Sequence, residues 1–194
     1  MTPTPHDVAA TYGENALVEA PAIALLESLG WKTANLYHDV GAALTAWAIM
    51  EEAMIPIMSY LLITDPTKAG IILYSTVNFQ VWINMLDELF AIEDRYAPLK
   101  SKWYKLGARL RGLKDNRDRL AHHAATMGEQ ASMFEISLRP SIMDLRAKSR
   151  KYEPMTREDI LRFRTLVSDL TRDLLSLGRE MTAMFEALQE KSPE

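Results

Sequence analysis

The stretch ILRFRTLVSDLTRDLLSLGREMTAMFEAL, residues 160–188, carries the clearest structural signal in the sequence. Its apolar residues alternate spacings of three and four, which is the periodicity of a helix that buries one face. They are Ile160, Phe163, Val167, Leu170, Leu174, Leu177, Met181, Met184 and Leu188. Thr156 precedes the stretch with Asp159 three residues on, close to a capping box. The pattern predicts a long helix that either packs along a bundle or forms a dimer contact.

The rest of the chain shows the punctuation of further helices. Gly30 is a helix terminator and Pro56 predicts a kink. Thr64 or Asp65 can cap a further helix, for which Pro66 suits the first position. Gly112 either ends a helix or loosens it. The predicted helices cover residues 16–29, 40–63, 66–96 and 99–111, besides the long one that follows Thr156.

These elements predict an all-α fold, an up-and-down bundle of four to five main helices with an additional N-terminal helix. The predicted division is an N-terminal segment, 1–38, and a helical domain, 39–194. Residues 129–154 are expected to connect the last two helices, with an extended piece in MFEISL, residues 133–138, and a basic run after it.

Composition limits the classes of protein. The 194 residues carry a net charge of -4 and are 48% hydrophobic, which is enough for one substantial core. The chain has no cysteine, so disulfides and thiolate sites are excluded. The start, MTPTPHDVAA, lacks the pattern of a secretory signal, and we expect a cytoplasmic protein.

One segment has the length of a membrane span. Residues 69–86 contain no charge but include Ser75, Thr76, Asn78, Gln80 and Asn84, whose polar groups are expensive in lipid. We expect a helix buried in the domain or at a subunit interface, and no membrane contact.

The stretch NRDRLAHH, residues 116–123, concentrates side chains that bind phosphate and transfer protons. If Asp115 caps a helix, Leu120, Ala124 and Met127 form its apolar face. His123 then lies beside the core and is expected to be partly buried. His122 and Arg117 flank the small Ala121, where an anion can approach the free N–H groups of a helix start.

The sequence RDRLAH, Arg117 to His122, resembles the signature of the HEPN superfamily (higher eukaryotes and prokaryotes nucleotide-binding domains): arginine, a polar residue, three more residues, then histidine. The resemblance implies a bundle of four or five helices, over about Val40 to Leu188, that dimerises so that two motifs face each other. Many members are metal-independent ribonucleases that act as toxins, in phage defence or in RNA processing. An antitoxin or a nucleotidyltransferase is the kind of partner that this implies.

The residue types suit cleavage of RNA by its own 2′-hydroxyl, which needs proton transfers and positive charge at the phosphate. We assign the proton transfers to His122, the phosphate charge to Arg117 and an orienting role to Asp118. The expected products carry a 2′,3′-cyclic phosphate and a 5′-hydroxyl. One chain supplies half of such a site, so a homodimer is expected. The alternative is a non-catalytic HEPN-like module that binds a nucleotide, RNA or a protein partner.

Positive charge gathers around the motif. Residues 100–119 hold eight basic against two acidic side chains, a local balance of +6. Such a concentration can hold a phosphate backbone, and Arg111, Lys114 and Arg119 are the candidate RNA contacts. The alternative is a solvated helix face with ordinary ion pairs. Trp103 and Tyr104 either stack on bases or, by the commoner pattern, pack in the core.

Metal and cofactor sites have little support in the sequence. None of the four histidines follows a glutamate at the spacing of a di-iron bundle. Glu51, Glu52, Glu93 and Asp94 are therefore interpreted as solvated carboxylates, and we expect neither a metal nor a cofactor.

The N-terminal stretch, residues 14–35, resembles the start of the R subunit of type I restriction enzymes, where a helix ends in leucine-glycine-tryptophan. The nuclease motif of that subunit does not follow, and no catalytic residue is transferred from it.

Overall fold

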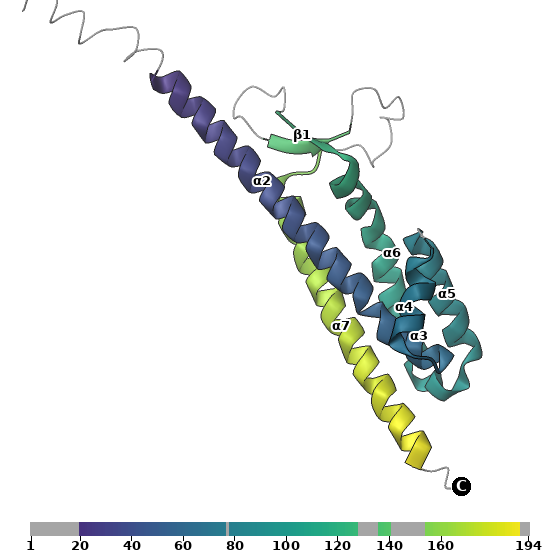
Figure 1. Cartoon of the computed structure of the whole chain (residues 1–194). Coiled ribbons are helices and arrows are strands. Elements are labelled where there is room, and N and C mark those ends of the chain that lie inside the picture. Colours follow the sequence, from purple (N-terminus) through teal and green to yellow (C-terminus); the bar gives the residue numbers. More distant parts are fainter. Residues whose placement is uncertain (1–19, 77, 128–135, 141–153, 191–194) are drawn as a thin grey trace, which may run out of the picture.

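The computed structural model describes residues 20–76, 78–127, 136–140 and 154–190 of the 194-residue chain. In chain order the elements are α2 (Ala20–Glu52), α3 (Met54–Leu62), α4 (Pro66–Tyr74), α5 (Phe79–Ile92), the 3-10 helix η2 (Asp94–Leu99), α6 (Lys100–His122), β1 (Ala124–Met127), β2 (Ile136–Arg139) and α7 (Arg157–Glu190). Helices dominate and pack as a bundle, which confirms the predicted all-α class (Figure 1).

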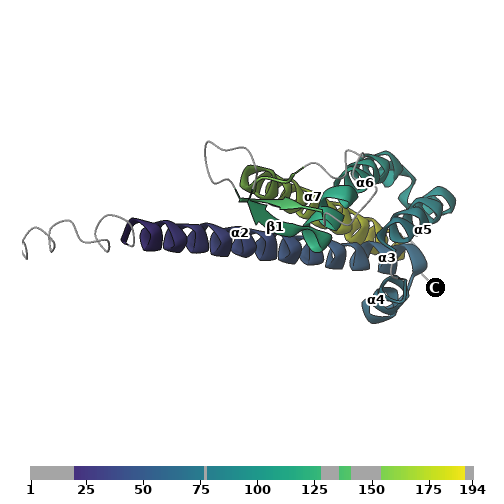
Figure 2. The same ribbon diagram turned by 90° about the horizontal axis from the view of Figure 1, so that it is seen from above.

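Two long helices, α2 and α7, form the axis of the bundle and run in the same direction (Figures 1 and 2). Near the start of α7, Arg157 donates from Nε to Oδ2 of the buried Asp39 at 2.6 Å. About two turns further along both helices, the rings of Trp47 and Phe163 stack with centroids 5.9 Å apart. The N-terminal part of α2 extends beyond the bundle, and α2 is continuous across residues 38 and 39.

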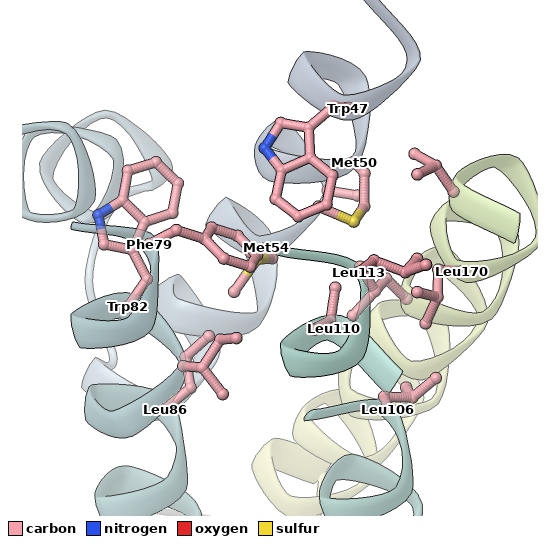
Figure 3. Close-up of a cluster of buried hydrophobic side chains, with 14 of the residues drawn as sticks. Trp47, Met50, Met54, Phe79, Trp82, Leu86, Leu106, Leu110, Leu113 and Leu170 are labelled. Carbon is pink, nitrogen blue, oxygen red and sulfur yellow. The ribbon is translucent and has the colours of Figure 1, made fainter. Parts of the chain in front are cut away.

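Helix α6 runs antiparallel to α7 and completes the central layer. Arg109 pairs with Asp173 at 2.5 Å, and Lys102, seven residues earlier, pairs with Glu180, seven residues later. Figure 3 shows leucines of α6 meeting Leu170 of α7, with aromatic side chains of α2 and α5 on the other side of the core.

The predicted face of α7 is buried from Ile160 to Met181, while Met184 is half-buried and Leu188 is exposed. The chain's own α2 and α6 cover it. Packing within the bundle therefore accounts for this seam.

Local capping explains where α7 begins. Asp159 accepts hydrogen bonds from the backbone N–H of Thr156 at 3.0 Å, and Thr156 Oγ1 accepts from the N–H of Asp159 at 3.2 Å. This is the reciprocal arrangement that the sequence predicts.

The helix end predicted at Gly30 is wrong, and of the two alternatives left open at Gly112, a helix end is not the one that the structure has. Helix α2 continues through Gly30 to Glu52, and α6 continues through Gly112 to His122. The kink predicted at Pro56 corresponds to an interruption of the helix at Ala53, between α2 and α3. Proline has no N–H for the carbonyl four residues earlier, which belongs to Glu52, and its ring crowds that carbonyl.

The single helix predicted over 66–96 is also wrong, because the chain forms α4, α5 and η2 there. Ser75 and Thr76 donate side-chain hydrogen bonds back to carbonyls of α4, at 2.6 and 2.8 Å. Asn78 then caps α5 by accepting from the N–H of Gln80 at 2.9 Å. These polar residues divide the uncharged segment 69–86 into two short helices.

A different stretch is long and apolar enough to cross a membrane by length and composition. It is Ala34–Leu62, with a mean hydropathy of 1.3 in its most apolar window, of which 39% is buried inside the structure. Core helices of soluble proteins have the same length and composition, so this stretch alone does not identify a membrane span.

A two-stranded antiparallel hairpin follows α6. In β1 and β2, Ala124 lies opposite Arg139 at one end of the pairing and Met127 lies opposite Ile136 at the other. Leu138 also forms an isolated antiparallel bridge with Met155. The prediction that Ala124 and Met127 lie on a helix is wrong, because α6 ends before them. β2 overlaps the extended piece expected in residues 133–138, whose first three residues lie outside the described part, as does the basic run after it.

Candidate functional site

The motif from Arg117 to His122 lies in the last turns of α6, a helix of 23 residues that begins at Lys100. Asp115 is inside this helix, so the expectation that it caps a new helix is wrong. The free N–H groups that were expected to attract an anion are therefore engaged in helix hydrogen bonds. The C-terminal end of a helix carries partial negative charge, which favours cations, and Arg119 and His122 occupy the last turn.

Arg117 and His122 point in different directions from α6. Five residues of α-helix separate two side chains by about 140° around the axis and about 7.5 Å along it. Arg117 is half-buried and lines a pocket, whereas His122 is exposed and does not line it. His123 is half-buried, as predicted. One chain therefore does not bring Arg117 and His122 to the same small group.

Asp118 connects the two basic side chains that precede it. Its Oδ2 accepts from Lys114 Nζ at 2.6 Å, and its Oδ1 accepts from Arg117 at 3.3 Å. Burial alone would raise the pKa of Asp118, but the hydrogen bonds and positive charges of Lys114 and Arg117 together lower it. Asp118 thus stays ionised and holds both cations at the pocket.

The pocket has a volume of about 640 Å³ and lies between α2, α6, the end of α4 and the start of α5. Its lining combines four aromatic, three uncharged polar and four charged residues. They are Trp47, Tyr74, Phe79 and Trp82; Thr76, Asn78 and Gln80; and Glu51, Lys114, Arg117 and Asp118.

The aromatic residues form a continuous set of ring contacts. Trp47 and Phe79 meet with centroids 4.7 Å apart, and Tyr74 meets Trp82 edge to face at 5.1 Å. Trp47, Phe79 and Trp82 are buried, and Figure 3 shows Trp47 of α2 facing the two rings of α5. Tyr74 is 54% exposed, so it offers an open ring at the pocket. The apolar wall is rigid on the core side and accessible at Tyr74.

Glu51 contributes a carboxylate to this pocket from α2. The indole Nε1 of Trp47 donates to Glu51 Oε1 at 2.6 Å. Burial raises the pKa of Glu51, although the hydrogen bond from Trp47 and the charge of Arg117 oppose the shift. The interpretation of Glu51 as a solvated carboxylate is therefore wrong, whereas Glu52 is exposed as expected.

The other candidate RNA contacts have structural partners. Arg111 pairs with Asp87 of α5, and Arg119 donates to Asn116 at 3.4 Å. Neither lines the pocket, whereas Lys114 does.

Ion pairs involve most of the basic side chains in residues 100–119. Besides Arg109 and Lys102, which pair with α7, Lys100 pairs with Asp94 at 3.5 Å. The alternative of an ordinary helix face with ion pairs thus describes much of this surface. Trp103 is fully buried, and Tyr104 is exposed.

Within the described ranges, no group of three or more His, Cys, Asp or Glu side chains is placed to hold a metal ion. Glu93 is held by Arg95, whose Nε donates to Oε1 at 2.8 Å, and the hydrogen bond from Arg95 lowers the pKa of Glu93.

The sequence alone did not connect Trp47, Glu51 and Tyr74 with the motif, which lies more than 40 residues away. One signal was present: Trp47 and Glu51 are four residues apart and therefore share a helix face. A glutamate on the same face as a buried tryptophan is a candidate for a buried carboxylate.

No protein-family model matches the chain, and the comparisons with curated proteins and with solved structures gave no significant match. The likenesses to HEPN proteins and to restriction-enzyme subunits therefore rest on the short stretches in which they were recognised.

Proposed function

We propose that this chain binds a nucleotide, either free or as one residue of an RNA strand, in the pocket beside Arg117. The observation that supports it is the placement of two cations, Lys114 and Arg117, beside an aromatic wall in a single cavity. Asp118 holds both cations but uses only part of their hydrogen-bonding capacity, because lysine has three donors and arginine five.

The chemistry of a nucleotide matches this arrangement part by part. Arginine and lysine bind phosphate oxygens, and a nucleobase stacks on an aromatic ring such as the exposed face of Tyr74. A cavity of about 640 Å³ falls within the range of pockets that hold small molecules.

Binding is tested by calorimetry with 5′-mononucleotides and the corresponding nucleosides. We expect nucleotides to bind more tightly than nucleosides, and Arg117→Ala or Lys114→Ala to weaken nucleotide binding by about tenfold or more, the loss expected for a charged hydrogen bond. Lys105→Ala is the matched control, because Lys105 is exposed on the same helix and does not line the pocket. Equal affinities for all four proteins, or no binding, contradict the proposal.

A second candidate is a metal-independent endoribonuclease of HEPN type that acts as a homodimer. The observation that favours it is His122, whose exposed side chain has no hydrogen bond or ion pair among the described residues. In a symmetric pair, His122 of one chain would approach the phosphate that Arg117 of the other chain binds. Exposed Ile71 and Ile72 lie on α4, which also carries the pocket residue Tyr74, and offer an apolar surface for such a pair.

Cleavage of end-labelled RNA in EDTA tests this candidate with wild type, Arg117→Ala, His122→Ala and Lys105→Ala. We expect cyclic phosphate ends from wild type and the control only, and dimers by sedimentation. Expression of wild type should also slow growth of the host, and His122→Ala should relieve the effect. Equal background cleavage by folded proteins would contradict the ribonuclease and leave the binding proposal to be decided by calorimetry.

A further inference from the structure

Glu51 is the one charged residue of the pocket that has no ion pair among the described residues. Its Oε1 accepts from Trp47, and no described side chain donates to Oε2. The two pocket cations are instead held by Asp118. A half-buried carboxylate with an unused oxygen favours a ligand that brings hydrogen-bond donors.

The direction of the Glu51 carboxylate is fixed by its support. Trp47 is 2% exposed, and its ring packs against Phe79 and Phe163, so its indole N–H has little freedom. The 2.6 Å hydrogen bond from Trp47 therefore restricts the position of the Glu51 carboxylate, one turn further along α2. The acceptor therefore comes from α2, whereas the cations come from α6.

A ligand that satisfies both helices carries an anionic group for the cations and at least one hydrogen-bond donor for Glu51. A pair of donors can use the free Oε2 together with the second lone pair of Oε1, which already accepts from Trp47. Among the nucleobases, guanine presents N1–H and the N2 amino group side by side, which matches the two acceptor oxygens of a carboxylate. Adenine and cytosine place an acceptor next to their amino group, and uracil places its single N–H between two carbonyls. An adjacent acceptor is repelled by a carboxylate, so those bases fit less well.

We propose that Glu51 recognises the Watson–Crick edge of guanine, so that the pocket selects a guanine nucleotide or a guanosine residue of RNA. Lys114 and Arg117 then bind its phosphate, and Tyr74 contacts the base. This inference rests on the proposed nucleotide binding and adds the identity of the base to it.

Calorimetry of the full chain with GMP, IMP, AMP, CMP and UMP tests the inference. Wild type should bind GMP at least about tenfold more tightly than AMP, CMP or UMP. IMP keeps N1–H but lacks the N2 amino group, and it should bind between GMP and AMP.

Glu51→Gln should weaken GMP binding by about 10- to 100-fold, because the amide replaces one acceptor with a donor, while AMP binding changes by less than about twofold. Glu52→Gln is the matched control, since Glu52 is the next residue, is exposed and does not line the pocket.

The outcomes separate the two proposals. Nucleotide binding that depends on Arg117 and Lys114 but shows no preference for guanine, or a preference that survives Glu51→Gln, overturns the role of Glu51 and leaves the nucleotide site standing. Absence of binding by every nucleotide overturns both.

Discussion

The indole Nε1 of Trp103 donates a hydrogen bond to Oδ1 of Asp87 at 2.8 Å and thereby ties the core of α6 to α5. The other oxygen of Asp87 pairs with Arg111. A carboxylate that joins a buried tryptophan to an arginine is part of the packing between two helices.

We expect Asp87→Ala to lower the free energy of unfolding by about 2–3 kcal/mol, because the buried Trp103 N–H and Arg111 both lose their acceptor. Arg111→Ala should lower it by about 1 kcal/mol, since Arg111 is partly exposed. Urea denaturation measures both. Nucleotide affinity should not change in Arg111→Ala, and a selective loss of nucleotide or RNA binding would instead support the sequence-based prediction of a phosphate contact.

The two glycines of α6 should respond differently to alanine. A Cβ at Gly107 would lie 3.3 Å from Nη1 of Arg111 and 3.6 Å from Oδ1 of Asp87, whereas a Cβ at Gly112 meets nothing within 4 Å. Gly112→Ala should stabilise the protein by about 0.5–1 kcal/mol, the usual gain within a helix. Gly107→Ala gains the same propensity but displaces Arg111, so we expect it to be at least about 1 kcal/mol less stable than Gly112→Ala. Equal stabilisation by Gly107→Ala and Gly112→Ala would show that Arg111 and Asp87 move aside at no measurable cost in stability.

Local signals predicted the parts of the fold that local interactions determine. The cap formed by Thr156 and Asp159 and the break near Pro56 depend on neighbours within four residues, and both are present. The helix end predicted at Gly30 was wrong because a glycine inside a long helix costs only about 1 kcal/mol, which the rest of a long helix outweighs; the same cost is tolerated at Gly112 in α6.

Longer-range pairing decided what the sequence did not reveal. Ala124 and Met127 have helical spacing, but β1 pairs with β2. The first residue of β1, Ala124, lies opposite Arg139, which is more than ten residues later in the chain. The site followed the same rule: Arg117 and Asp118 were recognisable by their motif, whereas Glu51 became a pocket residue only when α2 packed beside α6. Helical periodicity places residues on faces and does not identify which faces meet.

Ile63 stores backbone strain at the end of α3. Its φ of 49° and ψ of 54° lie in the left-handed region, which is unfavourable for a β-branched residue, and its side chain is 64% exposed. Ile63→Gly should therefore raise the free energy of unfolding by about 1 kcal/mol, because it relieves strain and loses little burial.

Leu62→Gly, at the preceding residue within α3, is the control for Ile63→Gly and should lower the free energy of unfolding by at least about 1 kcal/mol, because it loses helix propensity and the burial of a side chain that is only 36% exposed. Thermal and urea denaturation of the two variants measure the contrast. A loss of stability in both would mean that Ile63 adopts this conformation without strain.

The raised pKa of Glu51 predicts a pH dependence of stability. Its pKa in the folded protein lies above the ordinary value of 4.5, because burial disfavours the charged form, so the native state binds the proton more tightly than the unfolded chain. Stability should therefore fall as the pH rises from 4.5 through the raised pKa, and this loss should persist at neutral pH. Glu51→Gln cannot ionise and keeps an oxygen to accept from Trp47. We expect it to be more stable than wild type at neutral pH, with the difference shrinking toward about pH 4.

Melting temperatures of the ligand-free wild type, Glu51→Gln and the control Glu52→Gln, measured across this range, test the effect. A difference between wild type and Glu51→Gln that is constant with pH, or that grows toward acid, would mean that burial does not disfavour the Glu51 carboxylate. The guanine inference requires that Glu51 has an oxygen free to accept a hydrogen bond. If the charged Glu51 carboxylate lowers the stability of the ligand-free protein, the hydrogen bonds of a bound guanine would offset that cost. Stabilisation of the empty protein by Glu51→Gln, together with loss of GMP binding, would mark Glu51 as a residue retained for binding at the expense of stability.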